Sequence, residues 1–163
     1  MANTNQPTQS EMERQHAIKY NKQVWDLLGK ADRNEQDDAL MIHAAHCSYL
    51  YWLNAGTELN HQRGAWLLSR VYSEVGDGEL ALYFAGECHR LTQEHPAQMQ
   101  DFDFAYAEES LARANAVLHN FDEAEQHYQL ALTAAEQVAS EGDRELVLED
   151  LSGGAWGGFK ITA

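Results

Sequence analysis

The sequence predicts an all-α, single-domain fold of seven helices, each antiparallel to the next. Apolar side chains recur every three or four residues from about residue 10 to residue 151, the period of an amphipathic helix. No segment shows the alternating pattern of a strand. The breaks between helical segments are only a few residues long, which makes consecutive helices antiparallel neighbours. With 163 residues, the chain can bury a core without disulfide bonds or a structural metal.

Each helical segment has its own boundary signals. Thr57 and Asp77 can cap the third and fourth segments, and Pro96 ends the fourth. The predicted helices span about 10–29, 36–54, 57–76, 77–95, 101–118, 121–138 and 143–151.

The two ends of the chain lie outside this helical domain, which covers residues 10–151. Residues 1–9 are polar and are expected to be disordered. Residues 152–163 contain four glycines and are predicted to form a flexible tail. The tail carries Trp156 and Phe159, which suggests an alternative: these aromatic side chains fold back into a groove of the same chain or of a second copy.

Two of the helix pairs repeat one another at a constant spacing of 43 residues. Aligning Gly76-Asp77 with His119-Asn120 brings five further positions into register. The matched pairs are Leu68 and Leu111, Ser69 and Ala112, Ala81 and Ala124, Ala85 and Tyr128, and Cys88 and Ala131. A weaker copy, 42 residues before the second, puts three residues on the positions of Ala81, Ala85 and Cys88. They are Ala39, His43 and His46.

This pattern resembles tetratricopeptide (TPR) repeats, in which small residues lie where the two helices of a hairpin touch. The resemblance covers about residues 20–140 and is clearest in the last two copies. The spacing is longer than the family's repeat of about 34 residues, and no copy ends in the family's proline. The resemblance implies an α-α superhelix of about three antiparallel hairpins, with the seventh helix capping the last apolar face.

The charge balance restricts the classes of partner. Eleven basic residues oppose 26 acidic ones, for a formal net charge of −15. We therefore expect no binding to nucleic acid or to an anionic membrane. No apolar run reaches the roughly 18 residues of a membrane span. The two cysteines, and a start that lacks a signal-peptide pattern, predict a cytoplasmic protein.

The motifs of common enzymes are missing from the sequence. It contains no nucleophile elbow and no glycine-rich phosphate loop before a helix. We therefore predict a protein that is not an enzyme and has no cofactor. A competing interpretation is a small-ligand or metal-binding protein that uses His43 and His46, which lie one helical turn apart. No third ligand lies at a characteristic spacing.

Positive charges concentrate at one place in this acidic chain. Arg63, Trp66 and Arg70 share one stripe of a helix by their spacing. The TPR resemblance puts this stripe on the concave face of the array, together with Tyr106, Glu109 and Arg113. Arginine binds carboxylates through two hydrogen bonds and stacks on tryptophan.

These residues lead to the hypothesis of an interaction module that binds a protein or peptide, acidic or ending in a carboxylate, in its concave groove. In the alternative, the arginines pair with acidic residues of the same chain, and Trp66 belongs to the core. A further alternative is a homodimer or self-assembling scaffold that pairs through an exposed end face of the array.

Overall fold

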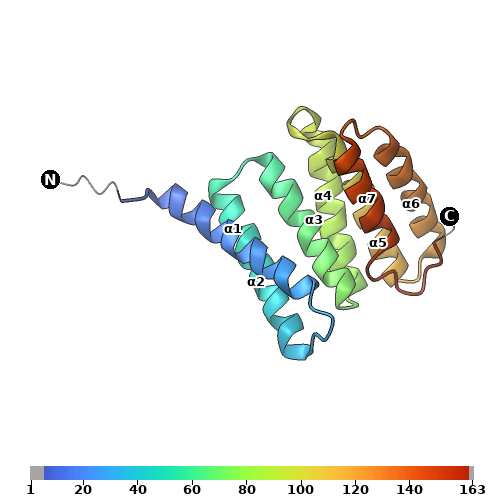
Figure 1. Cartoon of the computed structure of the whole chain (residues 1–163), viewed down its shortest axis with the longest axis horizontal. Helices are drawn as coiled ribbons and strands as arrows, with labels where there is room; N and C mark the ends of the chain where they lie inside the picture. Colours follow the sequence, from blue (N-terminus) through green and yellow to red (C-terminus); the bar gives the residue numbers. More distant parts are fainter. Residues whose placement is uncertain (1–5, 162–163) are drawn as a thin grey trace.

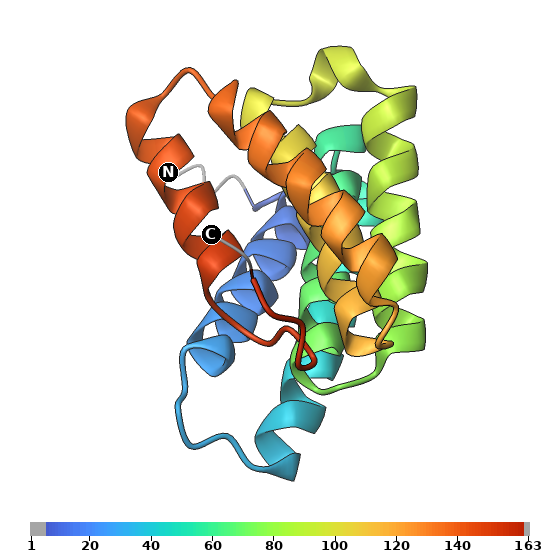
Figure 2. The same cartoon turned by 90° about the vertical axis from the view of Figure 1, so that its right-hand side faces the viewer.

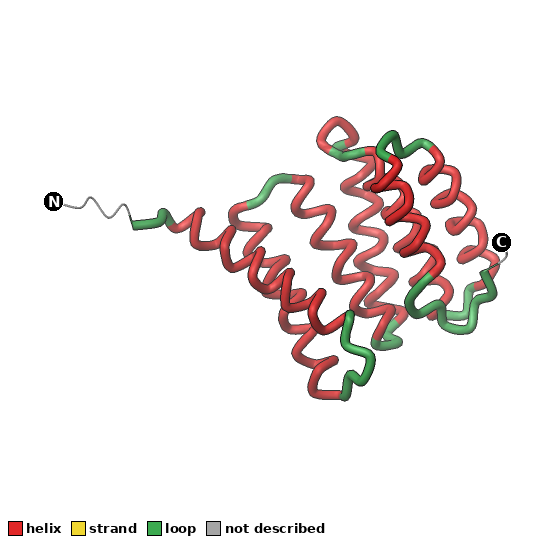
Figure 3. Tube along the Cα trace, in the orientation of Figure 1, coloured by secondary structure: helices red, strands yellow, loops and turns green. Residues whose placement is uncertain are grey.

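The computed structural model describes residues 6–161, and this part of the chain is helical and contains no strand (Figures 1 and 3). The elements are α1 (Gln9–Leu28), α2 (Glu35–Ala55), α3 (Glu58–Glu74), α4 (Gly78–Glu94), the short 3₁₀ helix η1 (Pro96–Gln98), α5 (Asp101–Val117), α6 (Phe121–Glu136) and α7 (Glu141–Ser152). The predicted helices agree with these bounds to within two residues, so the all-α fold class is confirmed.

Local capping chemistry explains where the first two helices begin. The Thr8 hydroxyl accepts the Glu11 N–H, and the Glu11 carboxylate accepts the Thr8 N–H in return. Asn34 and Asp37 form the same reciprocal pair at the start of α2. Each pair satisfies backbone donors that the first turn of a helix leaves free. Of the segment 1–9 expected to be disordered, residues 1–5 lie outside the described residues, and Gln9 already belongs to α1.

The helices form an array of antiparallel hairpins. The pairs α1–α2, α3–α4 and α5–α6 pack internally, and α2–α3 and α4–α5 join consecutive hairpins. In addition, α3 packs directly on α5, and α7 packs on both α5 and α6. Figure 2 shows α7 and α1 on the same side of the array. This arrangement is consistent with an α-α superhelix, and α7 lies against α5 and α6 on the side that also holds α1.

The repeat of 43 residues is visible in the backbone. Gly76 and His119 both have a positive φ, of 83° and 61°. After each of them, a backbone N–H bonds back five residues to the end of the preceding helix: Asp77 to Tyr72 and Asn120 to Asn115, both at 2.9 Å. This is the Schellman closure of a helix. The two hairpins therefore turn by the same local structure at aligned positions.

The first hairpin does not have the predicted register. Ala39, His43 and His46 are exposed, although the spacing of 42 residues put them at helix contacts. The buried residues of α2 are Met41, Ala44, Ala45 and Ser48. Met41, Ala45 and Ser48 precede Ala81, Ala85 and Cys88 by 40 residues instead. A shift of two residues turns a position by about 200° around a helix, so the predicted alignment selected the wrong face of α2.

The buried apolar residues form separate clusters along the array, and their composition changes toward the C-terminus. Leucine, valine and methionine side chains fill the space between the first four helices. Between α5, α6 and α7 the core consists mainly of alanines, and Tyr128, Val147, Leu151 and Trp156 complete it. No helix within residues 6–161 combines the length and apolar character needed to cross a membrane.

Candidate binding groove

A cavity of about 390 Å³ opens on the side of the array that α1, α3, α5 and α7 share. Its volume lies within the usual range of small-ligand sites, about 300–1,000 Å³. The residues that line it are Asn21, Trp25, Gln62, Arg63, Trp66, Leu67, Phe102, Asp103, Tyr106, Leu146 and Asp150. The four helices therefore contribute side chains to a single hollow, although their sequences lie up to 129 residues apart.

Four of the eleven residues that line the cavity are aromatic. Trp66 is central: its ring stacks on Trp25 with the centroids 5.9 Å apart, and it meets Tyr106 edge-on at 5.0 Å. Phe102 continues the row beside Tyr106 at 6.3 Å. Trp25 is 44% exposed, so part of this aromatic surface faces solvent.

Arg63 and Asp103 form a two-point ion pair at the edge of the cavity. Nε and Nη2 of Arg63 donate to the two Asp103 carboxylate oxygens at 2.9 and 3.0 Å. The Arg63 guanidinium lies 4.9 Å from the centre of the Phe102 ring, and the buried Asp103 also accepts the Gln100 N–H that starts α5. The arginine side chain remains 41% exposed, but its charge is balanced inside the protein.

Tyr106 and Asp150 connect α5 with α7 across the cavity. The Tyr106 hydroxyl donates to Asp150 Oδ2 at 2.7 Å. Burial, together with this hydrogen bond to a carboxylate, raises the pKa of Tyr106, so the phenol stays protonated and continues to donate. Asp150 is half-buried.

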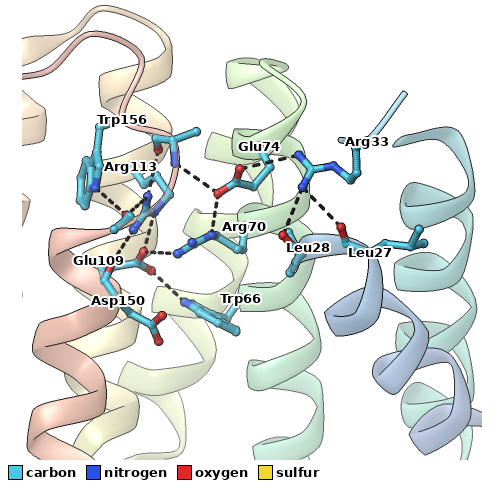
Figure 4. A network of polar contacts seen from close by, with 12 residues as sticks. Leu27, Leu28, Arg33, Trp66, Arg70, Glu74, Glu109, Arg113, Asp150 and Trp156 are labelled. Atoms are coloured by element: carbon cyan, nitrogen blue, oxygen red, sulfur yellow. Dashed lines mark hydrogen bonds and ion pairs between the residues drawn. The ribbon is translucent and has the colours of Figure 1, made fainter. Parts of the chain in front are cut away.

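Beside the cavity, the remaining predicted site residues form a buried network of charges (Figure 4). Arg113 Nε donates to Glu109 Oε1 at 2.6 Å, and Arg70 Nη1 reaches the same oxygen at 3.4 Å. Arg70 Nε donates to Glu74 at 3.2 Å. The second Glu109 oxygen accepts the indole N–H of Trp66 at 2.9 Å. Arg113 and Glu109 are each 1% exposed.

The segment after α7 covers this network. The Arg113 guanidinium donates to the backbone carbonyls of Asp150, Gly153 and Ala155 at 2.8–3.0 Å. It also lies 4.1 Å from the centre of the Trp156 ring. Arg113 thus satisfies carbonyls at the end of α7 and holds the following segment against α5. Burial lowers the pKa of the Arg113 guanidinium, and the adjacent Glu109 carboxylate favours its charged form.

Glycines allow the segment to come this close. Gly154 has φ +77°, and a Cβ there would lie 2.3 Å from Arg70 Nη2 and 2.8 Å from Arg113 Nη1. Gly157 has φ +54°, and its Cβ would meet the Ala116 carbonyl oxygen at 2.5 Å. Only glycine suits such a combination of left-handed backbone and close approach. The glycines that predicted flexibility therefore support a folded segment.

Residues 153–161 fold back onto the same chain and not into the groove: Trp156 and Phe159 pack on α5 and α6, and neither residue lines the cavity. Trp156 is 7% exposed and meets Tyr128 of α6 at 5.4 Å. Phe159 lies near Phe121, Tyr128 and Trp156. The aromatic rings complete the alanine-rich core between α5 and α6.

The six predicted groove residues thus divide into two groups. Arg63, Trp66 and Tyr106 line the cavity. Arg70, Glu109 and Arg113 lie beside it in the buried network, where the arginines pair with acidic residues of the same chain. Sequence reasoning missed the contributions of Trp25, Phe102, Asp103, Leu146 and Asp150. The i, i+4 spacing of Phe102 and Tyr106 was a usable signal.

The two candidate metal ligands lie away from the groove on α2. His43 is exposed, and His46 Nε2 lies 2.8 Å from the Tyr72 hydroxyl. Partial desolvation of the ring, together with the neighbouring His43, lowers the pKa of His46. In residues 6–161, no three or more His, Cys, Asp or Glu side chains are grouped so as to hold a metal ion.

Comparisons of this chain with protein-family models, with characterised proteins and with solved structures found no match.

Proposed function

We propose that the protein is a TPR-like interaction module, not an enzyme, and that its concave groove binds an extended segment of a protein partner. The observation that supports this proposal most strongly is the aromatic cavity between α1, α3, α5 and α7. Its volume of about 390 Å³ suits one or two side chains of a bound segment. Large aromatic anchors in pockets supply much of the affinity of protein interfaces.

Exposed apolar side chains at the edges of the groove support this proposal. Trp25 on α1 and Leu146 on α7 line the cavity and are 44% and 54% exposed. A patch of this kind at a hollow is typical of an interaction surface. The helical array alone is compatible with many functions, so the proposal depends on the cavity.

The test is a selection of displayed random peptides, about twelve residues long, on the immobilised full-length chain. Two matched variants test whether the selected peptides bind at the cavity. Leu146→Arg places a charged side chain in the cavity wall. Leu148→Arg makes the same change on the same helix, at an exposed residue that does not line the cavity. We expect peptides enriched on the wild type to bind Leu146→Arg at least about tenfold more weakly and Leu148→Arg with unchanged affinity.

Enrichment of peptides that bind both variants equally would contradict the proposal, because it would locate binding elsewhere on the surface. A selection that enriches no sequence on the wild type would contradict it as well. Circular dichroism and urea unfolding of both variants check that the substitutions leave the fold intact.

A further inference from the structure

The arginines next to the groove are not available to an acidic partner. Arg33, Arg70 and Arg113 form ion pairs with Asp38, Glu74 and Glu109. Three positive and three negative charges therefore balance within this network. Arg113 is also covered by the chain after α7. A carboxylate of a partner would have to displace these contacts in order to reach it.

The charged side chains of the cavity wall leave one carboxylate unbalanced. The wall carries Arg63, Asp103 and Asp150, and Arg63 is paired with Asp103. Asp150 forms no ion pair with any residue in 6–161, and its side chain accepts a hydrogen bond from the Tyr106 hydroxyl. The cavity wall thus has a net charge of −1, the opposite of what the arginine stripe predicted.

The surroundings of Asp150 suit a cation. Tyr106, which holds this carboxylate, contacts the Trp66 ring at 5.0 Å, and Trp25 extends the aromatic wall. Ring faces attract ammonium and guanidinium groups, especially where water is partly excluded. The net charge of −15 adds a long-range field that draws positive partners and repels acidic ones.

We infer that the groove anchors a basic side chain, Lys or Arg, of the bound partner, with Asp150 as its counter-ion and the rings of Trp66, Tyr106 and Trp25 around its aliphatic stem. This inference rests on the proposed function and specifies the chemistry of the ligand. The stem of a lysine or arginine packs on apolar surface while its charged end reaches a polar group. The cavity supplies both of these surroundings.

The test uses four short probes in ¹H–¹⁵N NMR titrations of the full-length chain. The probes are acetyl-Gly-Gly-Lys-Gly-Gly-amide and its arginine, norleucine and glutamate counterparts. We expect the Lys and Arg probes to shift the indole resonances of Trp25 and Trp66 and to bind at least about fivefold more tightly than norleucine. The glutamate probe is expected to bind most weakly.

Two variants of α7 test whether the preference for lysine over norleucine depends on Asp150. Asp150→Asn retains an oxygen that accepts from Tyr106, but removes the charge, and should abolish the difference between lysine and norleucine. Glu149→Gln removes an exposed charge from the neighbouring residue and should preserve that difference. Added salt should weaken the Lys probe more than the norleucine probe.

Equal binding of lysine and norleucine would overturn the inference and leave an apolar groove. Tighter binding of glutamate would overturn it in favour of an acidic partner. Failure of all four probes to shift the indole resonances would also overturn it, and the peptide selection would then decide separately whether the groove binds proteins at all.

Discussion

Two neighbouring regions of the concave face contain the same kinds of residue and differ in what covers them. The closed region consists of Arg70, Glu74, Glu109, Arg113 and residues 153–156, which lie over them. The open region is the cavity wall beside it, which includes Trp25, Arg63, Trp66, Tyr106 and Asp150. Glu109 links the regions, because it binds both Arg113 and Trp66.

The difference shows that a position on the concave face does not by itself make a residue available to a ligand. Arg70 and Arg113 are on the face that the helix spacing predicts, but a segment about 40 residues after Arg113 covers them. In the closed region arginine and tryptophan hold the fold together. In the open region the same chemistry faces solvent.

The largest expected effect is in the closed region, where Arg113→Ala should lower the free energy of unfolding by about 3–5 kcal/mol. The substitution leaves Glu109 buried without its closest cation and frees three backbone carbonyls. Urea unfolding measures the loss. The exposed Arg90, which pairs with Glu87 and Glu94 on the surface, is the control: Arg90→Ala should change stability little. Similar losses in the two variants would refute a special role for Arg113.

Substitution of one tryptophan in each region compares the stability of the two regions directly. Trp156→Ala removes a ring that is 7% exposed and packs on Arg113 and Tyr128. The substitution should lower the free energy of unfolding by about 3 kcal/mol. Trp25→Ala removes a ring that is 44% exposed, so the loss in free energy of unfolding should be less than half as large. The same substitution should weaken peptide binding. Thermal unfolding and the peptide titrations measure both effects. A stability cost for Trp25→Ala as large as that for Trp156→Ala would remove the distinction between the regions.

The smallest effects on stability are expected from two glycine substitutions, which should change the free energy of unfolding in opposite directions. Gly154→Ala should destabilise by about 1–3 kcal/mol, because the new Cβ meets both Arg70 and Arg113 and the backbone is left-handed. Gly86→Ala in α4, where a Cβ meets nothing within 4 Å, should stabilise by about 0.5–1 kcal/mol. A stabilising effect of Gly154→Ala would mean that the segment does not dock as described.

Much of the fold could be predicted because its signals are local. Capping residues and the 3.6-residue period located all seven helices, and the turn at Gly76 and His119 revealed the register of two hairpins. The register of the first hairpin failed because Ala39, His43 and His46 match the repeat only by residue type. Met41, Ala45 and Ser48 are buried because α2 packs against α1 and α3, and no local sequence pattern shows which face of α2 makes these contacts.

The candidate site was harder to predict, since it depends on contacts between distant segments. Helix spacing brought Arg63, Trp66 and Arg70 together, and the repeat added Tyr106. Whether Arg70 faces solvent depends on residues 153–156, whose glycines are compatible both with a flexible linker and with a backbone that packs closely on its neighbours. A glycine pair beside an aromatic residue is compatible with both.

The segment after α7 closes one region of the concave face and leaves the other open. Solvent exchange of the indole N–H protons in the full-length chain tests this arrangement most directly, with resonances assigned through Trp→Phe variants. The Trp156 indole donates to the Gly153 carbonyl at 3.0 Å and should exchange slowly, whereas the exposed Trp25 indole should exchange fast. Equally fast exchange of the two protons would contradict the account.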